Sequence, residues 1–187
     1  MFSARYIPNF ITGARIIFVP CLIWMLFQSH YERALILVLL MGLSDALDGF
    51  LARCYDWKTT LGSYLDPIAD KIMLLSAYLT FAILGWVPWW LSGLIIARDV
   101  VLLIGALCYH LSTRQLKMDP LALSKINTFA QIILAVSLIY AQVGPLSPQI
   151  ISVLITIVAC TTLASGSQYV VEWSRRAARV SASRAKL

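Results

Sequence analysis

Charged side chains are scarce in this sequence. Asp, Glu, Lys and Arg make up 13% of the 187 residues, whereas 60% of the residues are hydrophobic. A soluble domain is typically about a quarter charged and about half apolar. Together with a mean hydropathy of +0.80, this composition excludes an ordinary soluble domain and indicates a protein with several membrane spans.

Cysteine and histidine, the usual ligands of zinc, are also few. The two histidines and four cysteines are widely separated, and the cysteines form no Cys-x-x-Cys or His-paired spacing. The sequence therefore predicts neither a disulfide framework nor a typical zinc site. We interpret the cysteines as small apolar packing residues inside helices.

Apolar runs predict an all-α integral membrane protein with six transmembrane helices and a short interfacial segment over residues 1–14. The spans cover about 12–28, 33–51, 61–84, a stretch ending near 111, 126–143 and 149–171. Such lengths match a hydrocarbon core of about 30 Å. We expect one membrane domain over residues 1–175, followed by a basic tail over residues 176–187.

Basic residues fall almost entirely on one side of this predicted topology. The formal charge is +6, and only Arg33 lies in a turn on the opposite side. The other side carries the basic tail and seven further cations, Arg5, Arg15, Arg53, Lys58, Arg114, Lys117 and Lys125. This asymmetry predicts that both termini face the cytoplasm and that the cations meet membrane lipids, with no nucleic-acid partner.

Carboxylates are concentrated in one 26-residue stretch, which holds five of the nine acidic residues, and four of these form two pairs: Asp45 with Asp48, and Asp66 with Asp70. On helices, the first two are i,i+3 neighbours and the last two are i,i+4 neighbours, so each pair shares a face. Ionisable groups in membrane spans are costly and usually functional. The alternative is helix-end carboxylates that are solvated or paired with Arg53, Lys58 and Lys71.

Oxygen ligands without His or Cys suit Mg²⁺, Mn²⁺ or Ca²⁺. Two opposed aspartate pairs would need such cations between them. Gly49 and Gly62 would let a ligand come close to the backbone, and Arg53 supplies a cation for phosphate. Carboxylates, divalent metal and arginine are typical of phosphoryl transfer, so we expect a substrate that contains a diphosphate.

The spacing Asp45-x2-Asp48-Gly49-x2-Ala52-Arg53-x8-Gly62-x3-Asp66-x3-Asp70 resembles the signature of the CDP-alcohol phosphotransferase family at every position. The resemblance implies a six-helix membrane enzyme, often a homodimer, that transfers a phosphate-bearing lipid group from a CDP-linked substrate to an alcohol and releases CMP. It implies that Asp45, Asp48, Asp66 and Asp70 hold two Mg²⁺ or Mn²⁺ ions. It also implies that Asp70 is the general base, and that the nucleotide and diphosphate contact Gly49, Ala52, Arg53 and Gly62.

Further segments resemble the branch of this family that makes phosphatidylglycerol phosphate and cardiolipin. Residues 7–12 with Arg15, and residues 65–71, are similar to that branch as a whole. Residues 96–100 (Ile-Ala-Arg-Asp-Val) and 124–128 (Ser-Lys-Ile-Asn-Thr) are more similar to its cardiolipin synthases. The resemblance therefore implies CDP-diacylglycerol as donor and favours phosphatidylglycerol as acceptor, with glycerol 3-phosphate as the alternative.

The acceptor in this branch carries a phosphate, for which the sequence offers Arg15, Arg98 and Lys125 as cationic partners. Arg98 precedes Asp99 within a predicted span, so a pair that only balances charge is the structural alternative. A divalent-cation channel or transporter is the alternative from another functional class. It would need polar residues that reach both faces. We expect an enzyme in a bacterial or mitochondrial inner membrane, with its site on the cytoplasmic or matrix side.

Overall fold

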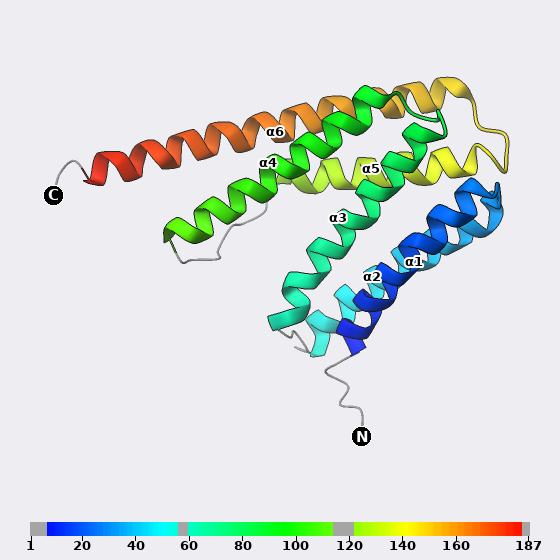
Figure 1. Cartoon of the computed structure of the whole chain (residues 1–187), viewed down its shortest axis with the longest axis horizontal. Helices are drawn as coiled ribbons and strands as arrows, with labels where there is room; N and C mark the ends of the chain where they lie inside the picture. The colour runs from blue at the N-terminus through cyan, green and yellow to red at the C-terminus, as the bar shows by residue number, and fades with distance from the viewer. Residues whose placement is uncertain (1–6, 56–59, 114–121, 185–187) are drawn as a thin grey trace.

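The computed structural model describes the backbone of residues 7–55, 60–113 and 122–184, and the side chains within residues 17–44, 71–104 and 123–169. These backbone ranges contain six α-helices and no strand (Figure 1). The all-α prediction is therefore confirmed. The helices are α1 (Ile7–Phe27), α2 (Tyr31–Tyr55), α3 (Thr60–Ile83), α4 (Trp89–Thr113), α5 (Ala122–Tyr140) and α6 (Pro148–Arg184).

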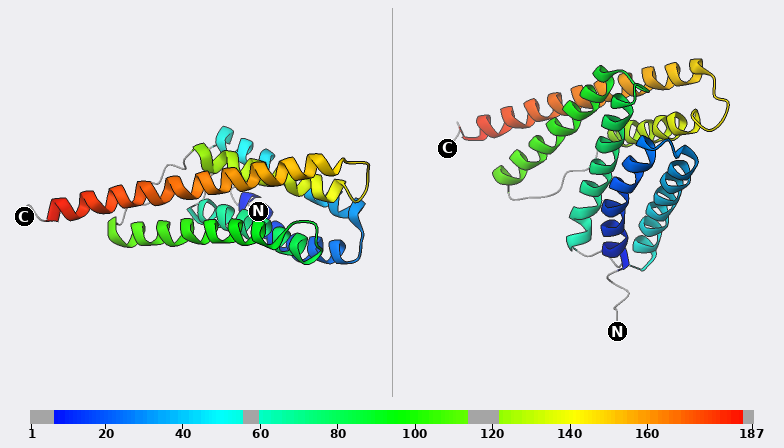
Figure 2. Two further views of the ribbon diagram at one scale, coloured as in Figure 1. Left: turned by 90° about the horizontal axis from the view of Figure 1, so that it is seen from above. Right: turned by 45° about the vertical axis from the view of Figure 1, so that its right-hand side comes forward.

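The helices pack mainly on their neighbours in a splayed bundle. Helix α1 contacts both α2 and α3, α5 lies along α6, and α4 contacts α3 and α6. Helix α5 also contacts α2 and α3, and so links the half of the bundle formed by α1–α3 to the half formed by α4–α6. The α1–α2, α3–α4 and α5–α6 turns gather at one end, and the helices spread apart toward the other end (Figures 1 and 2).

Two of these turns follow helices that close with a Schellman motif. After α3, Gly85 has a φ of 75°, and the Trp86 amide donates to the Phe81 carbonyl over 2.9 Å. The Phe81 and Trp86 rings stack with centroids 5.5 Å apart, which supplies the apolar contact typical of this cap. After α1, Ser29 takes the left-handed position with a φ of 60°. At both ends, amides that follow the helix donate to carbonyls of its last turns.

The hydrophobic core lies near the turn end and draws on every helix. Tyr78 and Phe81 of α3 are fully buried at its centre. Around them pack buried residues of the other helices, among them Leu22, Leu26, Ala34, Val38, Leu91, Ile95, Leu134, Leu138 and Val158. This common core fixes the turn end of the bundle. The segments with the aspartates extend away from it.

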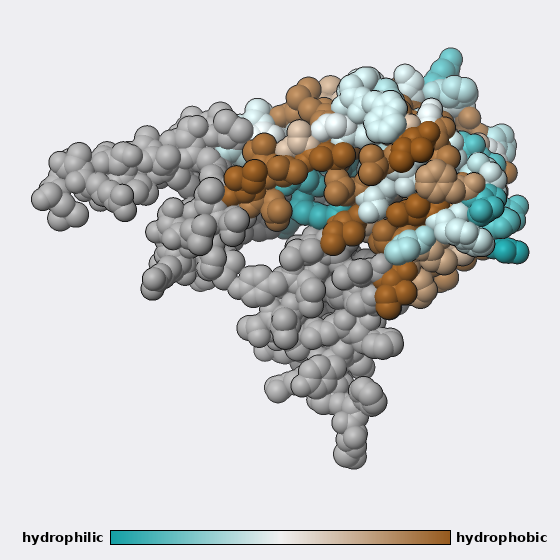
Figure 3. Space-filling model, in the orientation of Figure 1, coloured by the Kyte–Doolittle hydropathy of each residue, from teal (hydrophilic) through white to brown (hydrophobic). Residues whose placement is uncertain are grey.

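The outer surface of the described helices is rich in apolar side chains, which colour much of it brown in Figure 3. By length and composition, two described segments are suited to cross a membrane, Leu123–Tyr140 and Pro148–Tyr169. Ile17–Phe27 and Lys71–Ile83 are shorter apolar helices. Helices α5 and α6 are therefore long and apolar enough to cross a membrane, whereas six crossings remain a prediction.

The predicted spans differ from the helices at several ends. Helix α1 already begins at Ile7, inside the predicted interfacial segment, and α2 continues to Tyr55 through part of the predicted polar connection. Helix α6 continues past residue 171 to Arg184. Hydropathy locates a membrane span, whereas the helix itself continues wherever polar residues still favour it. The 37 residues of α6 span about 55 Å, so the C-terminal end of α6 projects beyond the other helices (Figure 1).

Candidate active site

The two predicted aspartate pairs lie on helix segments at the end of the bundle opposite the short turns. Asp45 and Asp48 are in the C-terminal part of α2, and Asp66 and Asp70 are in the N-terminal part of α3. These two parts are consecutive in the chain, joined through residues 56–59. The helical spacing expected within each pair is confirmed, whereas the positions of the carboxylates lie outside the described side chains.

The predicted nucleotide-site residues occupy the same two segments. Gly49, Ala52 and Arg53 follow Asp48 on α2, and Gly62 lies in the first turn of α3. Arg15, one of the predicted acceptor ligands, is on α1, the helix that contacts both α2 and α3. The contacts of these side chains are outside the described part of the structure, and their roles therefore remain predictions.

The donor set of four carboxylates fits two hard divalent cations by its chemistry. Its members come from two helices that both pack on α1, at one end of the bundle. Among the described side chains, no other group of three or more Asp, Glu, His or Cys residues could hold a metal. The aspartate stretch thus remains the metal site that the sequence predicts.

Arg98 is the most buried cation among the described side chains and joins three helices. Its side chain is 4% exposed. Its Nη1 donates to Asp99 Oδ1 over 2.6 Å, and its Nη2 donates to Ser124 Oγ of α5 and Ser165 Oγ of α6 over 2.7 and 2.8 Å. Its Nε is buried without a hydrogen-bond partner. The predicted Arg98–Asp99 pair is therefore present, within a larger network.

Lys71, the residue after Asp70, extends this network to α3. Its Nζ lies 2.7 Å from Asp99 Oδ1, the same oxygen that accepts from Arg98. The sequence offered Lys71 as a cationic partner of the signature aspartates. In the structure it pairs with Asp99, and 39% of its side chain remains exposed. Lys125, the third predicted acceptor ligand, is exposed on α5 next to Ser124.

A second polar cluster, missed by sequence reasoning, follows Arg98 along α5 and α6. Asn127 is fully buried, and its Oδ1 accepts from the hydroxyls of Thr161 and Thr162, each over 2.9 Å. Gln131, one turn further along α5, is also buried. The side-chain amide nitrogens of Asn127 and Gln131 both lack hydrogen-bond partners. The signal in the sequence was polar residues spaced by three or four within two otherwise apolar spans.

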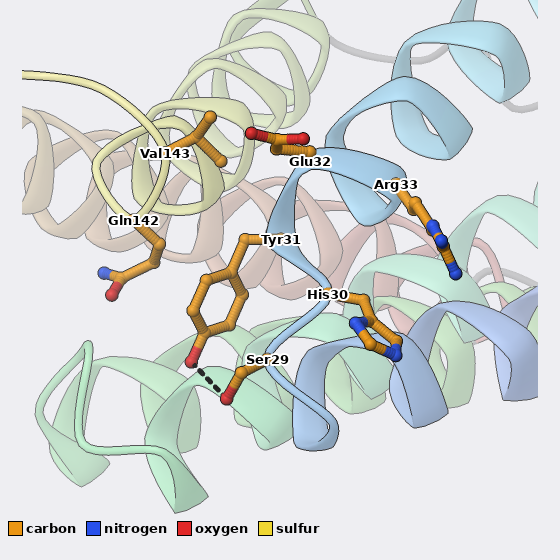
Figure 4. A pocket seen from close by; sticks show the side chains of 7 residues that line it. All are labelled: Ser29, His30, Tyr31, Glu32, Arg33, Gln142 and Val143. Atoms are coloured by element: carbon orange, nitrogen blue, oxygen red, sulfur yellow. Dashed lines mark hydrogen bonds between the residues drawn. The ribbon is translucent and has the colours of Figure 1, made fainter.

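A cavity of about 370 Å³ opens at the turn end, between the α1–α2 and α5–α6 turns (Figure 4). It is lined by Ser29, His30, Tyr31, Glu32, Arg33, Gln142 and Val143. Arg33 and Glu32 point away from each other, while the Tyr31 hydroxyl donates to Ser29 Oγ over 3.1 Å. The cavity is separated from the aspartate segments by the length of the bundle, so it is not the proposed site of chemistry.

Comparison with known proteins agrees with the aspartate signature. The sequence profile described as "CDP-alcohol phosphatidyltransferase" matches residues 5–164. A cardiolipin synthase (CMP-forming) of Rattus norvegicus is 32% identical over 182 residues, which cover 87% of this chain and 60% of the rat protein. The chain thus spans less than two thirds of that relative.

Relatives that carry a different name are equally similar. The chloroplastic CDP-diacylglycerol–glycerol-3-phosphate 3-phosphatidyltransferase 1 of Oryza sativa is 32% identical over 186 residues, 89% of this chain and 56% of the rice protein. The CDP-diacylglycerol–glycerol-3-phosphate 3-phosphatidyltransferase of Aquifex aeolicus is 32% identical over 143 residues, 75% of this chain and 76% of the bacterial protein. Overall identity therefore does not separate the two acceptors.

Proposed function

Because the chain belongs to the CDP-alcohol phosphatidyltransferase family, we propose that it transfers the phosphatidyl group of CDP-diacylglycerol to a glycerol-type hydroxyl and releases CMP. The observation that carries this proposal is the aspartate signature on two consecutive helix segments. Names of relatives at 32% identity support the same reaction class. The profile match extends over most of the described helices.

In the proposed reaction, Asp70 accepts the proton of the acceptor hydroxyl. The hydroxyl oxygen attacks the phosphorus that bears diacylglycerol, a new phosphodiester bond forms, and the bond to CMP breaks. Gly49, Ala52, Arg53 and Gly62 hold the CDP group, with Arg53 against phosphate.

Members of the family are in general metal-dependent, and Asp45, Asp48, Asp66 and Asp70 are the residues that would hold two Mg²⁺ or Mn²⁺ ions. When bound, such ions neutralise phosphate oxygens and make up for the weak basicity of a carboxylate at neutral pH. Removing divalent metal with EDTA is expected to abolish CMP release, and either cation added back should restore it.

For the acceptor, we propose phosphatidylglycerol, which would give cardiolipin. The two segments that resemble cardiolipin synthases, residues 96–100 and 124–128, meet in the structure through the bond between Arg98 and Ser124. Lys125 and Arg15 are proposed to contact the acceptor phosphate. Arg98 is proposed to add a fixed positive charge to the same acceptor site. Glycerol 3-phosphate is the alternative acceptor, supported by the rice and Aquifex relatives.

The acceptor is tested with purified protein in phosphatidylcholine nanodiscs that contain CDP-diacylglycerol and Mg²⁺. Either phosphatidylglycerol or glycerol 3-phosphate is added, CMP is quantified, and the lipid product is identified by mass spectrometry. We expect CMP and cardiolipin with phosphatidylglycerol. Phosphatidylglycerol phosphate formed with glycerol 3-phosphate, and no cardiolipin formed with phosphatidylglycerol, would reverse the order of the two acceptors. Absence of CMP with both would contradict the enzyme assignment.

A divalent-cation channel or transporter is not favoured. The aspartate segments occupy one end of the bundle, and the polar side chains described on α4, α5 and α6 bond mainly to one another. We further propose a homodimer in a bacterial or mitochondrial inner membrane, with the aspartate end on the cytoplasmic or matrix side. Uptake of Mn²⁺ into liposomes that contain the protein is expected to stay at background.

A further inference from the structure

We propose that Asp99 is a positioning residue that fastens the aspartate-bearing segment of α3, through Lys71, to an anchor built by α4, α5 and α6. The proposal rests on the proposed function, because it concerns the same metal-binding carboxylates. It assigns Lys71 and Asp99 a role in the order and orientation of Asp66 and Asp70, without contact between Asp99 and the substrate.

The anchor is Arg98, which is held from three sides. One Nη atom donates to Asp99, and the other donates to Ser124 and to Ser165. Its aliphatic stem lies beside Gly166 of α6, where an added Cβ would be 3.7 Å from Arg98 Cγ. A guanidinium held by three helices has little freedom to rotate, and it fixes the Asp99 carboxylate that it contacts.

The fixed carboxylate then holds α3. Within the described side chains, two polar contacts join α3 to α4: Ser92 Oγ donates to the Tyr78 carbonyl over 2.9 Å, and Lys71 pairs with Asp99 over 2.7 Å. Tyr78 and Lys71 are two turns apart on one side of α3, as are Ser92 and Asp99 on α4. The two contacts therefore repeat along an antiparallel helix pair, and the second lies nearer the aspartates.

Lys71 is placed where this contact matters for chemistry. It follows Asp70 directly and lies just over one turn after Asp66 on the same helix. A helix rotates as a unit over so short a distance, so the Lys71–Asp99 contact sets the rotation of α3 at both aspartates. The contact also gives the Lys71 ammonium a counter-ion, which keeps it from competing with divalent cations for the neighbouring carboxylates.

The test compares Lys71→Met with Lys71→Arg in the full-length protein. Loss of a residue that orients metal ligands typically costs about 10- to 100-fold in metal affinity or activity. We expect a loss of that order in Lys71→Met, seen as a lower kcat and a higher Mg²⁺ concentration for half-maximal CMP release, with little change in the acceptor KM. Lys71→Arg keeps the ion pair and should stay within about threefold of the wild type.

A double-mutant cycle identifies Asp99 as the partner. Asp99→Asn should reproduce the shift in Mg²⁺ dependence, and Lys71→Met/Asp99→Asn should be no worse than Asp99→Asn alone, because both substitutions remove the same contact. Arg33→Met is the matched control, since it removes an exposed cation from the opposite end and should leave the Mg²⁺ dependence unchanged. Thermal unfolding measured on each variant separates loss of fold from loss of metal affinity.

A second readout needs no turnover: the rise in unfolding temperature when Mn²⁺ alone is added. If the wild type releases no CMP, the proposed function fails. The positioning role still stands if Lys71→Met loses the Mn²⁺ shift and Lys71→Arg keeps it. Three results would overturn the positioning role: a wild-type Mg²⁺ or Mn²⁺ response in Lys71→Met, a Lys71→Arg variant as impaired as Lys71→Met, or multiplicative losses in the double variant.

Discussion

The two halves of the bundle differ in how their polar residues are balanced. The consecutive parts of α2 and α3 hold four carboxylates within 26 residues. Among the described side chains, α4, α5 and α6 instead hold one buried guanidinium, which bonds to one carboxylate and two serine hydroxyls, and a separate cluster in which Asn127 accepts from two threonines. We propose that the first set takes up cations from outside, whereas the second is paired mainly within the chain. In our proposal, the first set binds the metal ions and the second set positions the helix that carries Asp66 and Asp70.

The largest expected effect on activity comes from the proposed metal-binding aspartates of α2 and α3. Asp70→Asn keeps the size of the side chain but removes the general base, and such a loss typically lowers the rate about 10²- to 10⁴-fold. We expect CMP release to fall by this amount while CDP-diacylglycerol still binds. Rates from single-turnover experiments, together with binding measured by retention of labelled donor, provide the check. Wild-type turnover in Asp70→Asn would exclude Asp70 as the base.

On the positioning side, Arg98→Met is expected to lower stability most. The substitution leaves Lys71 as the cation that the structure places beside the Asp99 carboxylate. It also removes the hydrogen bonds that Arg98 donates to Ser124 and Ser165. Removing one partner of a buried ion pair typically costs about 3–5 kcal/mol. A large drop in unfolding temperature in detergent should result. An unchanged unfolding temperature would show that the network contributes nothing to the fold.

Asn127→Ala should lower stability less and spare the chemistry. It removes the acceptor for Thr161 and Thr162 and also an amide nitrogen that is buried without a partner. Hydrogen bonds between membrane helices average about 0.6 kcal/mol, so we expect a loss near 1 kcal/mol. The Mg²⁺ dependence of CMP release should stay at the wild-type value, in contrast to Lys71→Met. A shift in that dependence would extend the metal-positioning network to α5 and α6 beyond Arg98.

The smallest effects are expected from two glycines that bracket the start of α4. Gly85→Ala places a side chain at a φ of 75° and should destabilise by about 1 kcal/mol. Gly93 lies within α4 with nothing within 4 Å of an added Cβ, so Gly93→Ala should stabilise by up to about 1 kcal/mol through helix propensity. An unchanged or higher unfolding temperature in Gly85→Ala would contradict the cap assigned to α3.

The sequence predicted the helices better than the contacts between them. Apolar runs located every helix, and the aspartate spacing placed both pairs on the correct helices, because hydropathy and helical periodicity are local properties. The partner of Lys71 could not be predicted, since Asp99 lies on another helix and the contact depends on how α3 packs on α4. The same holds for Ser165, whose contact with Arg98 depends on how α4 and α6 pack.

The end of α6 illustrates a different limit. Hydropathy falls after residue 171, so the predicted span ended there, but the backbone remains helical to Arg184. Residues 172–184 include Glu, Ala and Arg, which are strong helix formers although they are unsuited to the hydrocarbon core. A membrane-span prediction and a helix prediction are therefore separate statements about this segment.

The most direct measurement is the stoichiometry of CMP release by the wild-type protein. CDP-diacylglycerol, Mg²⁺ and phosphatidylglycerol are supplied in nanodiscs, and CMP and new phospholipid are quantified together. A phosphatidyltransferase predicts equal amounts of the two products, both dependent on the acceptor and both absent in EDTA. No CMP, or CMP that forms without any acceptor-derived lipid, would contradict it.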